Sequence, residues 1–298
     1  YAPEGAQGYL IEQIREIISS VSLAPIRAQG KVYILDRVDL LGVKAANAFL
    51  KTLEEPVPGV TFILLGRTRE GVLPTIVSRC QVVPFRHIPA LEAAGILSQK
   101  TGVTPQQARI AIEACNGSIT RAITFAKSAE RSEFRARIME VLANLPLADA
   151  RDVLEYAAEL IERAKAPLDN VRTQQSEELA ESADFLTKAA LKQVELRHKR
   201  TLTMATKESL NQMTSIIRSW LRDVLMIASG TPELVINVDQ RQALEIAAQK
   251  VTPAGIMSAL REAYKTDEAL SYNVSPETCL DALLFSIREV LHGSGNSH

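Results

Sequence analysis

The sequence has little of several features that would point to a specific class of protein. Its 298 residues include three cysteines, Cys80, Cys115 and Cys279, and no two of them form a C-x-x-C pair. We therefore expect neither a disulfide framework nor a metal site of the usual zinc-ligand spacing. No apolar run approaches the roughly 20 residues that a bilayer-spanning helix needs. We expect no secretory signal and no membrane contact, and thus a cytoplasmic protein.

Charge of one sign is not in excess either. Lys and Arg number 34 against 35 Asp and Glu, so the composition lacks the basic surplus that indicates nucleic-acid binding. Any contact with DNA would have to come from a local patch or from partner proteins. Internal repeats, low-complexity runs and a phosphate-binding G-x-x-x-x-G-K-[ST] loop are absent as well. The length and the 46% hydrophobic content indicate a globular chain of two or three domains.

The first part of the chain has the pattern of a parallel sheet. An apolar run that ends in Asp36 is followed by a helical segment and then by a second apolar run. Buried strands separated by a helix belong to a parallel sheet, which presents polar groups where its strands end. The expected elements are helices over 9–21 and 45–55 and strands over 31–36, 61–65 and 81–85.

The rest of the chain has helical spacing of apolar residues almost throughout. Thr104-Pro105 and Ser275-Pro276 are typical helix starts, and the single tryptophan, Trp220, is expected to be a core residue between helices. The acid-rich stretch 166–182 could be a flexible connection or an exposed helix start. The other helices are expected over 91–100, 104–115, 119–129, 135–143, 148–165, 185–228, 239–251, 252–267 and 275–292.

Three separate motifs in the first part point to a known family. By their order and spacing, the chain resembles the AAA+ core of bacterial clamp-loader subunits, and in particular the delta-prime family of such subunits in DNA polymerase III. The resemblance covers about the first 130 residues, and the helical remainder matches in general character. The motifs are Val32-Tyr-Ile-Leu-Asp36, Ala46-Asn-Ala-Phe-Leu-Lys-Thr-Leu-Glu-Glu-Pro56 and Leu73-Pro-Thr-Ile-Val-Ser-Arg-Cys80.

The resemblance implies an α/β plus all-α architecture. A partial AAA+ (RecA-like) parallel-sheet domain would occupy residues 1–87, a small helical lid 88–130 and a helical collar bundle 131–293, with a tail over 294–298. His87 would lie at a domain junction. Members of this family usually have a four-cysteine zinc module and a phosphate-binding loop upstream of these motifs. We therefore expect the sequence to start inside the first domain of a longer protein.

The same resemblance assigns a role to the motif Ser78-Arg79-Cys80. The arginine of this motif points toward ATP held by a neighbouring subunit, so Arg79 would be an arginine finger acting in trans, with Ser78 and Cys80 supporting the loop. A guanidinium suits this role because its charge is permanent and its planar fork can contact two phosphate oxygens. The alternative is a surface arginine that caps a helix carbonyl or pairs locally.

Two departures from the family pattern argue against ATP hydrolysis by this chain itself. Asp36 matches the Walker B carboxylate, but Arg37 follows it where working ATPases have Glu, and Arg cannot act as a base. The polar sensor residue at the end of the next strand is replaced by Gly66 and Arg67, with Thr68 just beyond. Asp36 would thus be a vestigial site residue. Alternatively it simply ends a strand and pairs with Arg37 or Lys44.

A third departure lies in the expected lid, where Thr120 stands at the position of a second sensor arginine and Arg121 comes one residue later. Lys51 is a weak candidate for a phosphate contact, although it and Glu54 and Glu55 more simply form a solvated helix face. A basic cluster could meet phosphate or an acidic partner, or be a solvated face; it comprises Lys192, Arg197, His198, Lys199, Arg200 and Lys207.

The resemblance therefore implies a non-hydrolysing clamp-loader subunit. This chain would bind no cofactor, while ATP and Mg²⁺ would lie on the neighbouring subunit. Its partners would be the gamma/tau and delta clamp-loader subunits, the sliding clamp and primed DNA. Two alternatives stay open, a fragment of the gamma/tau motor ATPase and a helical scaffold with a decayed AAA+ remnant.

Overall fold

The computed structural model of the protein describes residues 1–3, 8–23, 30–86, 88–182, 187–271 and 274–292. Contacts divide the chain into two compact units, Tyr1–Arg86 and His87–His298. The described elements of the first unit include a small parallel sheet, and those of the second are helices only. His87 and the tail over 294–298 lie outside the described residues. The division of the second unit into a lid and a collar stays a prediction.

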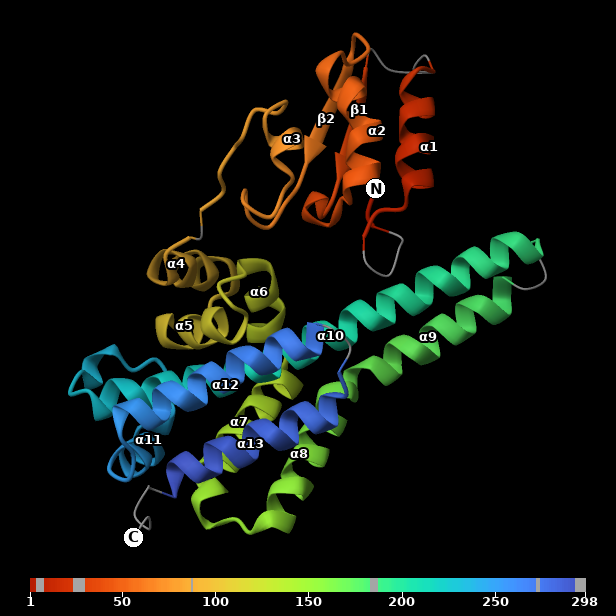
Figure 1. The fold of residues 1–298 in the computed structure, drawn as a ribbon. Helices are drawn as coiled ribbons and strands as arrows, with labels where there is room; N and C mark the ends of the chain where they lie inside the picture. Colours follow the sequence, from red (N-terminus) through yellow and green to blue (C-terminus); the bar gives the residue numbers. More distant parts are fainter. Residues whose placement is uncertain (4–7, 24–29, 87, 183–186, 272–273, 293–298) are drawn as a thin grey trace. The chain divides into compact units, whose positions relative to one another are not determined.

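The sheet of the first unit consists, in the described part of the chain, of β1 (Lys31–Leu35) and β2 (Val60–Leu64). The strands are parallel, as predicted. Helix α2 (Val43–Glu54) connects them, and α1 (Ile11–Val21) packs beside α2 (Figure 1). These strands and helices confirm the predicted elements, with bounds that differ by two residues or fewer.

One face of this sheet is covered and the other is not. Tyr33 and Leu35 of β1 are buried with the helices α1 and α2, and the ring of Phe62 on β2 lies 5.2 Å from that of Phe49 on α2. The alternate residues Val32 and Ile34 point to the opposite face, where 63% and 49% of their surface is exposed. The sheet therefore has an apolar face without a covering layer in the described part of the chain.

The predicted strand over 81–85 is wrong. These residues form no strand, and Val83 and Phe85 are 64% and 93% exposed. A strand needs a neighbour with free backbone groups, and no described strand lies beside this segment. The extended, apolar sequence favours a strand, but without a partner it stays irregular.

A short helix that the sequence did not indicate precedes the motif at residues 78–80. Pro74 fixes the first turn of α3 (Pro74–Val77), and Ser78 follows as its C-terminal cap residue. A 3₁₀ turn, η1 (Val38–Leu40), follows β1 in the same unit. Both elements lie near the carboxyl ends of the strands or after them in sequence.

The second unit is a helical bundle (Figure 1). Its α-helices are α4 (Ala90–Thr101), α5 (Pro105–Ala114), α6 (Ile119–Lys127), α7 (Ala129–Asn144), α8 (Ala150–Lys165), α9 (Pro167–Ser182), α10 (Lys188–Ala228), α11 (Arg241–Ala248), α12 (Pro253–Ser271) and α13 (Pro276–Leu291). Its 3₁₀ turns are η2 (Leu145–Leu147), η3 (Pro232–Leu234) and η4 (Val238–Gln240).

Capping residues account for several helix starts. Thr104 and Gln107 form a capping box at α5, Asp149 and Asp152 form one at α8, and Ser275 caps α13. The predicted starts at Thr104 and Ser275 are thus confirmed. The acid-rich stretch 166–182, for which two readings stayed open, is the helix α9.

The core of the second unit is continuous from Ala93 to Leu291. Helix α10 contacts α5, α7, α8, α11 and α12, and its Trp220 is fully buried, as predicted. None of the described helices has the length and apolar composition that a membrane span requires.

Candidate functional site

Arg79 lies on the surface of the first unit and is held by groups of that unit. Its Nε donates to Oε1 of Glu54 at 2.6 Å, and its Nη2 forms an ion pair with the same oxygen. Its Nη1 donates to the carbonyl oxygen of Thr75 at 3.0 Å and to Oγ of Ser78 at 3.2 Å. The arginine side chain is 29% exposed and that of Glu54 47%. This is the local pairing that the alternative interpretation describes, formed at an accessible surface.

The backbone places the two partners of this pair. Glu54 is the last residue of α2, and Arg79 follows the short helix α3, which packs against α2. A helix C-terminus carries partial negative charge on its free carbonyl groups, and both helix ends face the guanidinium. A cation is therefore favoured at this position even before the carboxylate is counted.

Ser78 and Cys80 support the loop around Arg79. The hydroxyl of Ser78 donates to the carbonyl oxygen of Thr75 and accepts from Arg79. Cys80 is half-buried against the core of the first unit. Burial raises the pKa of the Cys80 thiol, so this thiol stays protonated at neutral pH and packs rather than reacts.

Asp36 lies at the carboxyl end of β1 and is exposed. Its carbonyl oxygen accepts a hydrogen bond of 2.6 Å from Tyr9, and burial together with the charge of Asp36 raises the pKa of Tyr9 to about 12. Within the described residues, the Asp36 carboxylate makes no ion pair and no contact with the motif at 78–80. The suggested pairing with Arg37 is not found.

Arg37 is held by Asp39 instead. Its backbone is in the left-handed region, with φ of 55° and ψ of 48°, a conformation uncommon for residues other than glycine. Its Nε and Nη2 donate to the carboxylate of Asp39 over 3.0 to 3.2 Å. Burial alone would raise the pKa of Asp39, but the hydrogen bonds and charge of Arg37 outweigh it, so the pKa is lowered. The position after the Walker B-like strand thus holds a fixed ion pair and no base.

Gly66 is required by packing at the end of β2. A Cβ added there would lie 2.8 Å from Cγ2 of Val72, which is too close for an unshifted neighbour. A cavity of about 660 Å³ opens beside this strand end and is lined by residues that include Gly66, Arg67, Thr68, Cys80 and Phe85. The space therefore lies at the carboxyl end of a parallel strand, where polar sites are usual.

The second unit places its candidate residues apart. Thr120 and Arg121 are both exposed, and Arg121 forms an ion pair with Glu208 of α10. In the basic cluster on α10, His198 is paired with Glu178 of α9. Lys51 of the first unit is exposed on α2. Of the solvated face predicted around Lys51, Glu54 is an exception because it binds Arg79.

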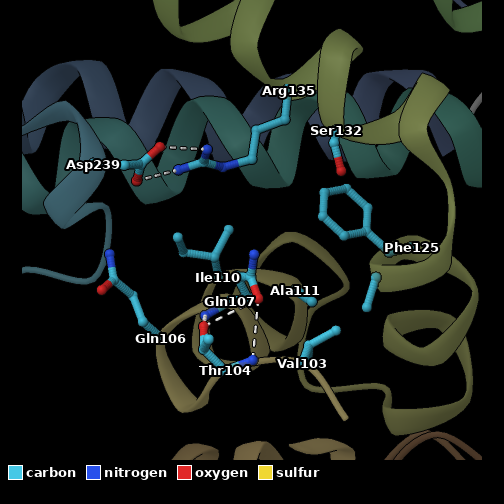
Figure 2. A pocket seen from close by; sticks show the side chains of 11 residues that line it. Val103, Thr104, Gln106, Gln107, Ile110, Ala111, Phe125, Ser132, Arg135 and Asp239 are labelled. Atoms are coloured by element: carbon cyan, nitrogen blue, oxygen red, sulfur yellow. Dashed lines mark hydrogen bonds and ion pairs between the residues drawn. The ribbon is translucent and has the colours of Figure 1, made fainter. Parts of the chain in front are cut away.

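A second cavity, of about 430 Å³, lies within the helical unit (Figure 2). Val103, Ile110, Ala111 and Phe125 give it an apolar side. Its charged residues, Arg135 and Asp239, point toward each other and bind through two hydrogen bonds of 2.8 and 3.0 Å. With these charges satisfied by each other, the cavity has the character of a packing space rather than a reaction centre.

Sequence reasoning missed the polar network behind this cavity. Asp223 is fully buried on α10 and accepts hydrogen bonds from the backbone of Ile236 and Asn237 and from the amide of Asn237. Asn237 in turn accepts from Arg135 at 2.7 Å. The signal was the acid two residues after Trp220-Leu221 inside an apolar run, which indicates a buried polar partner. Among the described residues, no group of His, Cys, Asp or Glu could hold a metal ion.

Comparison with family models gives two matches. Residues 2–89 match the model described as "DNA polymerase III, delta subunit", and residues 176–289 match "DNA polymerase III, delta subunit, C terminal". The first match includes the sheet and Arg79. The second includes most of α9 and α10 and the helices that follow.

Curated relatives come from the same polymerase. The chain is 42% identical over 77 residues to the gamma subunit of DNA polymerase III from Buchnera aphidicola subsp. Acyrthosiphon pisum, over 26% of this chain and 21% of the relative. It is 39% identical over 89 residues to the Bacillus subtilis tau subunit, over 30% and 16%. It is 29% identical over 129 residues to the Bacillus subtilis delta' subunit, over 43% and 39%. The chain thus spans well under half the length of these relatives.

Among solved structures, a DNA polymerase III gamma subunit-related protein from Thermotoga maritima aligns with 97% of this chain and 82% of its own, at 19% identity and a TM-score of 0.43. The assignment rests on the sequence matches. The two family models and the curated gamma, tau and delta' relatives together support placing this chain in the clamp-loader family of DNA polymerase III subunits.

Proposed function

We propose that this chain is a stationary, delta-prime-type clamp-loader subunit that hydrolyses no ATP itself and supplies Arg79 to the ATP site of a neighbouring subunit. The observation that carries this proposal is the place of Arg79. It ends a Ser-Arg motif after a short helix, on an accessible surface, with partners that also lie at the surface. A surface ion pair is weak, so the guanidinium can be taken over by a stronger anion.

The chemistry of the finger follows from its charge. When ATP binds to the neighbour, charge develops on its terminal phosphate during hydrolysis, and a fixed guanidinium stabilises that charge. Arginine fingers of this kind contribute on the order of 10³ to 10⁵ in rate in GTPases. Ser78, through its contact with Nη1 of Arg79, keeps the arginine aligned with the end of α3.

Two local structures support the absence of hydrolysis by this chain. Arg37 follows Asp36 and is bound to Asp39, so no carboxylate stands ready to orient a water next to Asp36 on that side. Gly66 stands where a polar sensor would read the phosphate, and a larger residue there collides with Val72. Asp36 then remains as a vestigial carboxylate.

The proposed setting is the cytoplasmic clamp-loader complex. Its partners would be the gamma/tau and delta subunits, the sliding clamp and primed DNA, with ATP and Mg²⁺ on the neighbour. In this view the first unit is a partial AAA+ (RecA-like) domain. The helices after it are the lid and the collar through which subunits associate.

A second candidate, a fragment of a gamma/tau motor, is favoured by one observation. The local identity is higher with gamma and tau relatives, at 42% and 39%, than with the delta' relative, at 29%. Arg37 and Gly66 argue against it. ATP turnover by the full-length protein alone separates the two, because a motor subunit hydrolyses ATP and a stationary subunit does not.

Substitution of Arg79 separates the finger from the third possibility, a scaffold without a catalytic contribution. In a complex reconstituted with the full-length protein, Arg79→Ala should leave assembly intact and lower ATP turnover at the neighbouring subunit. Unchanged turnover would favour the scaffold.

A further inference from the structure

We propose that Glu54 is a positioning residue that stores Arg79 on its own subunit until the phosphate of a neighbour displaces the carboxylate. This inference rests on the proposed function and concerns the regulation of the same site. It arises from the contacts of the guanidinium, which in this structure are all made within the first unit.

The stored arrangement occupies most of the donors that a phosphate would need. A guanidinium has five N–H donors, and its edges can each present two of them to an anion. The edge formed by Nε and Nη2 faces a single oxygen, Oε1 of Glu54. Nη1 is directed to the Thr75 carbonyl oxygen and the Ser78 hydroxyl. The side chain is thus folded back onto the ends of α2 and α3.

The balance of charge allows exchange. Glu54 offers one negative charge at an exposed position and uses one oxygen, whereas a terminal phosphate offers more negative charge and several oxygens in a fork geometry. An exposed ion pair shifts an equilibrium by a factor of about five at most. Glu54 therefore holds Arg79 when no neighbour is present without preventing its transfer.

The neighbouring residue provides a matched control. Glu55 is also exposed and directly follows Glu54, but the described contacts of Arg79 do not include it. Glu55→Gln changes the net charge of this helix end by the same amount as Glu54→Gln. Only the second substitution removes the carboxylate that binds the guanidinium.

The experiment uses the clamp-loader complex reconstituted with the full-length protein, and it measures ATP turnover with and without primed DNA. In Glu54→Gln we expect turnover without DNA to rise about two- to five-fold. We expect little change with DNA, because the phosphate then already holds Arg79. Glu55→Gln should match the unsubstituted protein, and Glu54→Gln combined with Arg79→Ala should match Arg79→Ala alone.

A second readout is independent of turnover. In the unbound full-length protein, the Nε proton of Arg79, observed by NMR, should exchange faster with water in Glu54→Gln than in Glu55→Gln. If Glu54→Gln leaves both the turnover without DNA and this exchange unchanged while Arg79→Ala lowers turnover, the storage role is refuted and the finger stands. If Arg79→Ala has no effect, the proposed function itself fails.

Discussion

Single residues at the strand ends set what the first unit can do chemically. Arg37 is turned into the left-handed region and fixed by Asp39, and Gly66 is held without a side chain by Val72. Neither position leaves a group that could activate water. Arg79, in contrast, keeps a permanent charge at the surface.

The packing at Gly66 gives a prediction at this scale. Gly66→Ala places a Cβ 2.8 Å from Val72, and overpacking of this kind costs about 1–3 kcal/mol. We expect faster amide hydrogen exchange in β2, measured residue by residue, and partial recovery in the double variant with Val72→Ala. Unchanged exchange in Gly66→Ala would show that the neighbour moves freely.

The buried Asp223 gives a second residue-scale prediction. Asp223→Ala leaves the backbone N–H groups of Ile236 and Asn237 without their acceptor, so the free energy of unfolding should fall by about 3–5 kcal/mol. The only tryptophan, Trp220, is buried one helical turn away, and its fluorescence in a denaturant titration reports this unfolding. Asp169→Ala, at an exposed pair with Arg172, should change it by less than about 0.5 kcal/mol.

Among the elements, helices are joined by charge at their ends. Glu277 in the first turn of α13 binds Lys165 in the last turn of α8 at 2.8 Å, and Ser275 also donates to it. The hydrogen bond from Lys165, followed by that from Ser275, lowers the pKa of Glu277 from 4.5 to about 2.

This pair predicts a dependence on pH. Because the pKa is lowered in the folded state, the contribution of Glu277 is complete above pH 4.5 and is lost as the pH falls toward 2. The pair is exposed, so the contribution should stay below about 1 kcal/mol. The difference in unfolding free energy between the unsubstituted protein and Glu277→Gln, followed by Trp220 fluorescence, should shrink from pH 6 to pH 3. A constant difference would contradict the assignment.

The elements also show what sequence patterns can predict. Thr104 and Ser275 announced helix starts because capping is local chemistry, and Trp220 was placed in the core because its surroundings are apolar at helical spacing. The strand over 81–85 failed because a strand depends on a distant partner. The Glu54 contact was missed for the same reason, since 25 residues separate it from Arg79. Ser78-Arg79-Cys80 could be found in advance only as a motif, while its contacts needed the fold.

At the scale of the whole molecule, the first unit has an incompletely covered sheet. Parallel sheets are usually covered on both faces, yet Val32, Ile34 and Ile63 are exposed on one face of β1 and β2. An apolar face of this kind favours association with other surfaces.

Self-association of this 298-residue chain should therefore decrease in Ile34→Lys, measured by light scattering at increasing protein concentration. The fold should persist, because the substitution lies on the exposed face. Leu35→Lys, on the covered face, should instead unfold the first unit. Equal scattering of Ile34→Lys and the unsubstituted chain would mean that this face does not drive association.

The most direct test of the account is the turnover of ATP bound to the neighbouring subunit, in a complex reconstituted with full-length protein carrying Arg79→Ala, Arg79→Lys or the control Arg67→Ala. Arg67 is an exposed arginine of the same unit. The account predicts a loss of about 10³-fold at that site for Arg79→Ala, incomplete rescue by lysine, which lacks the planar fork, and normal turnover for Arg67→Ala. Normal turnover in a fully assembled Arg79→Ala complex would contradict it.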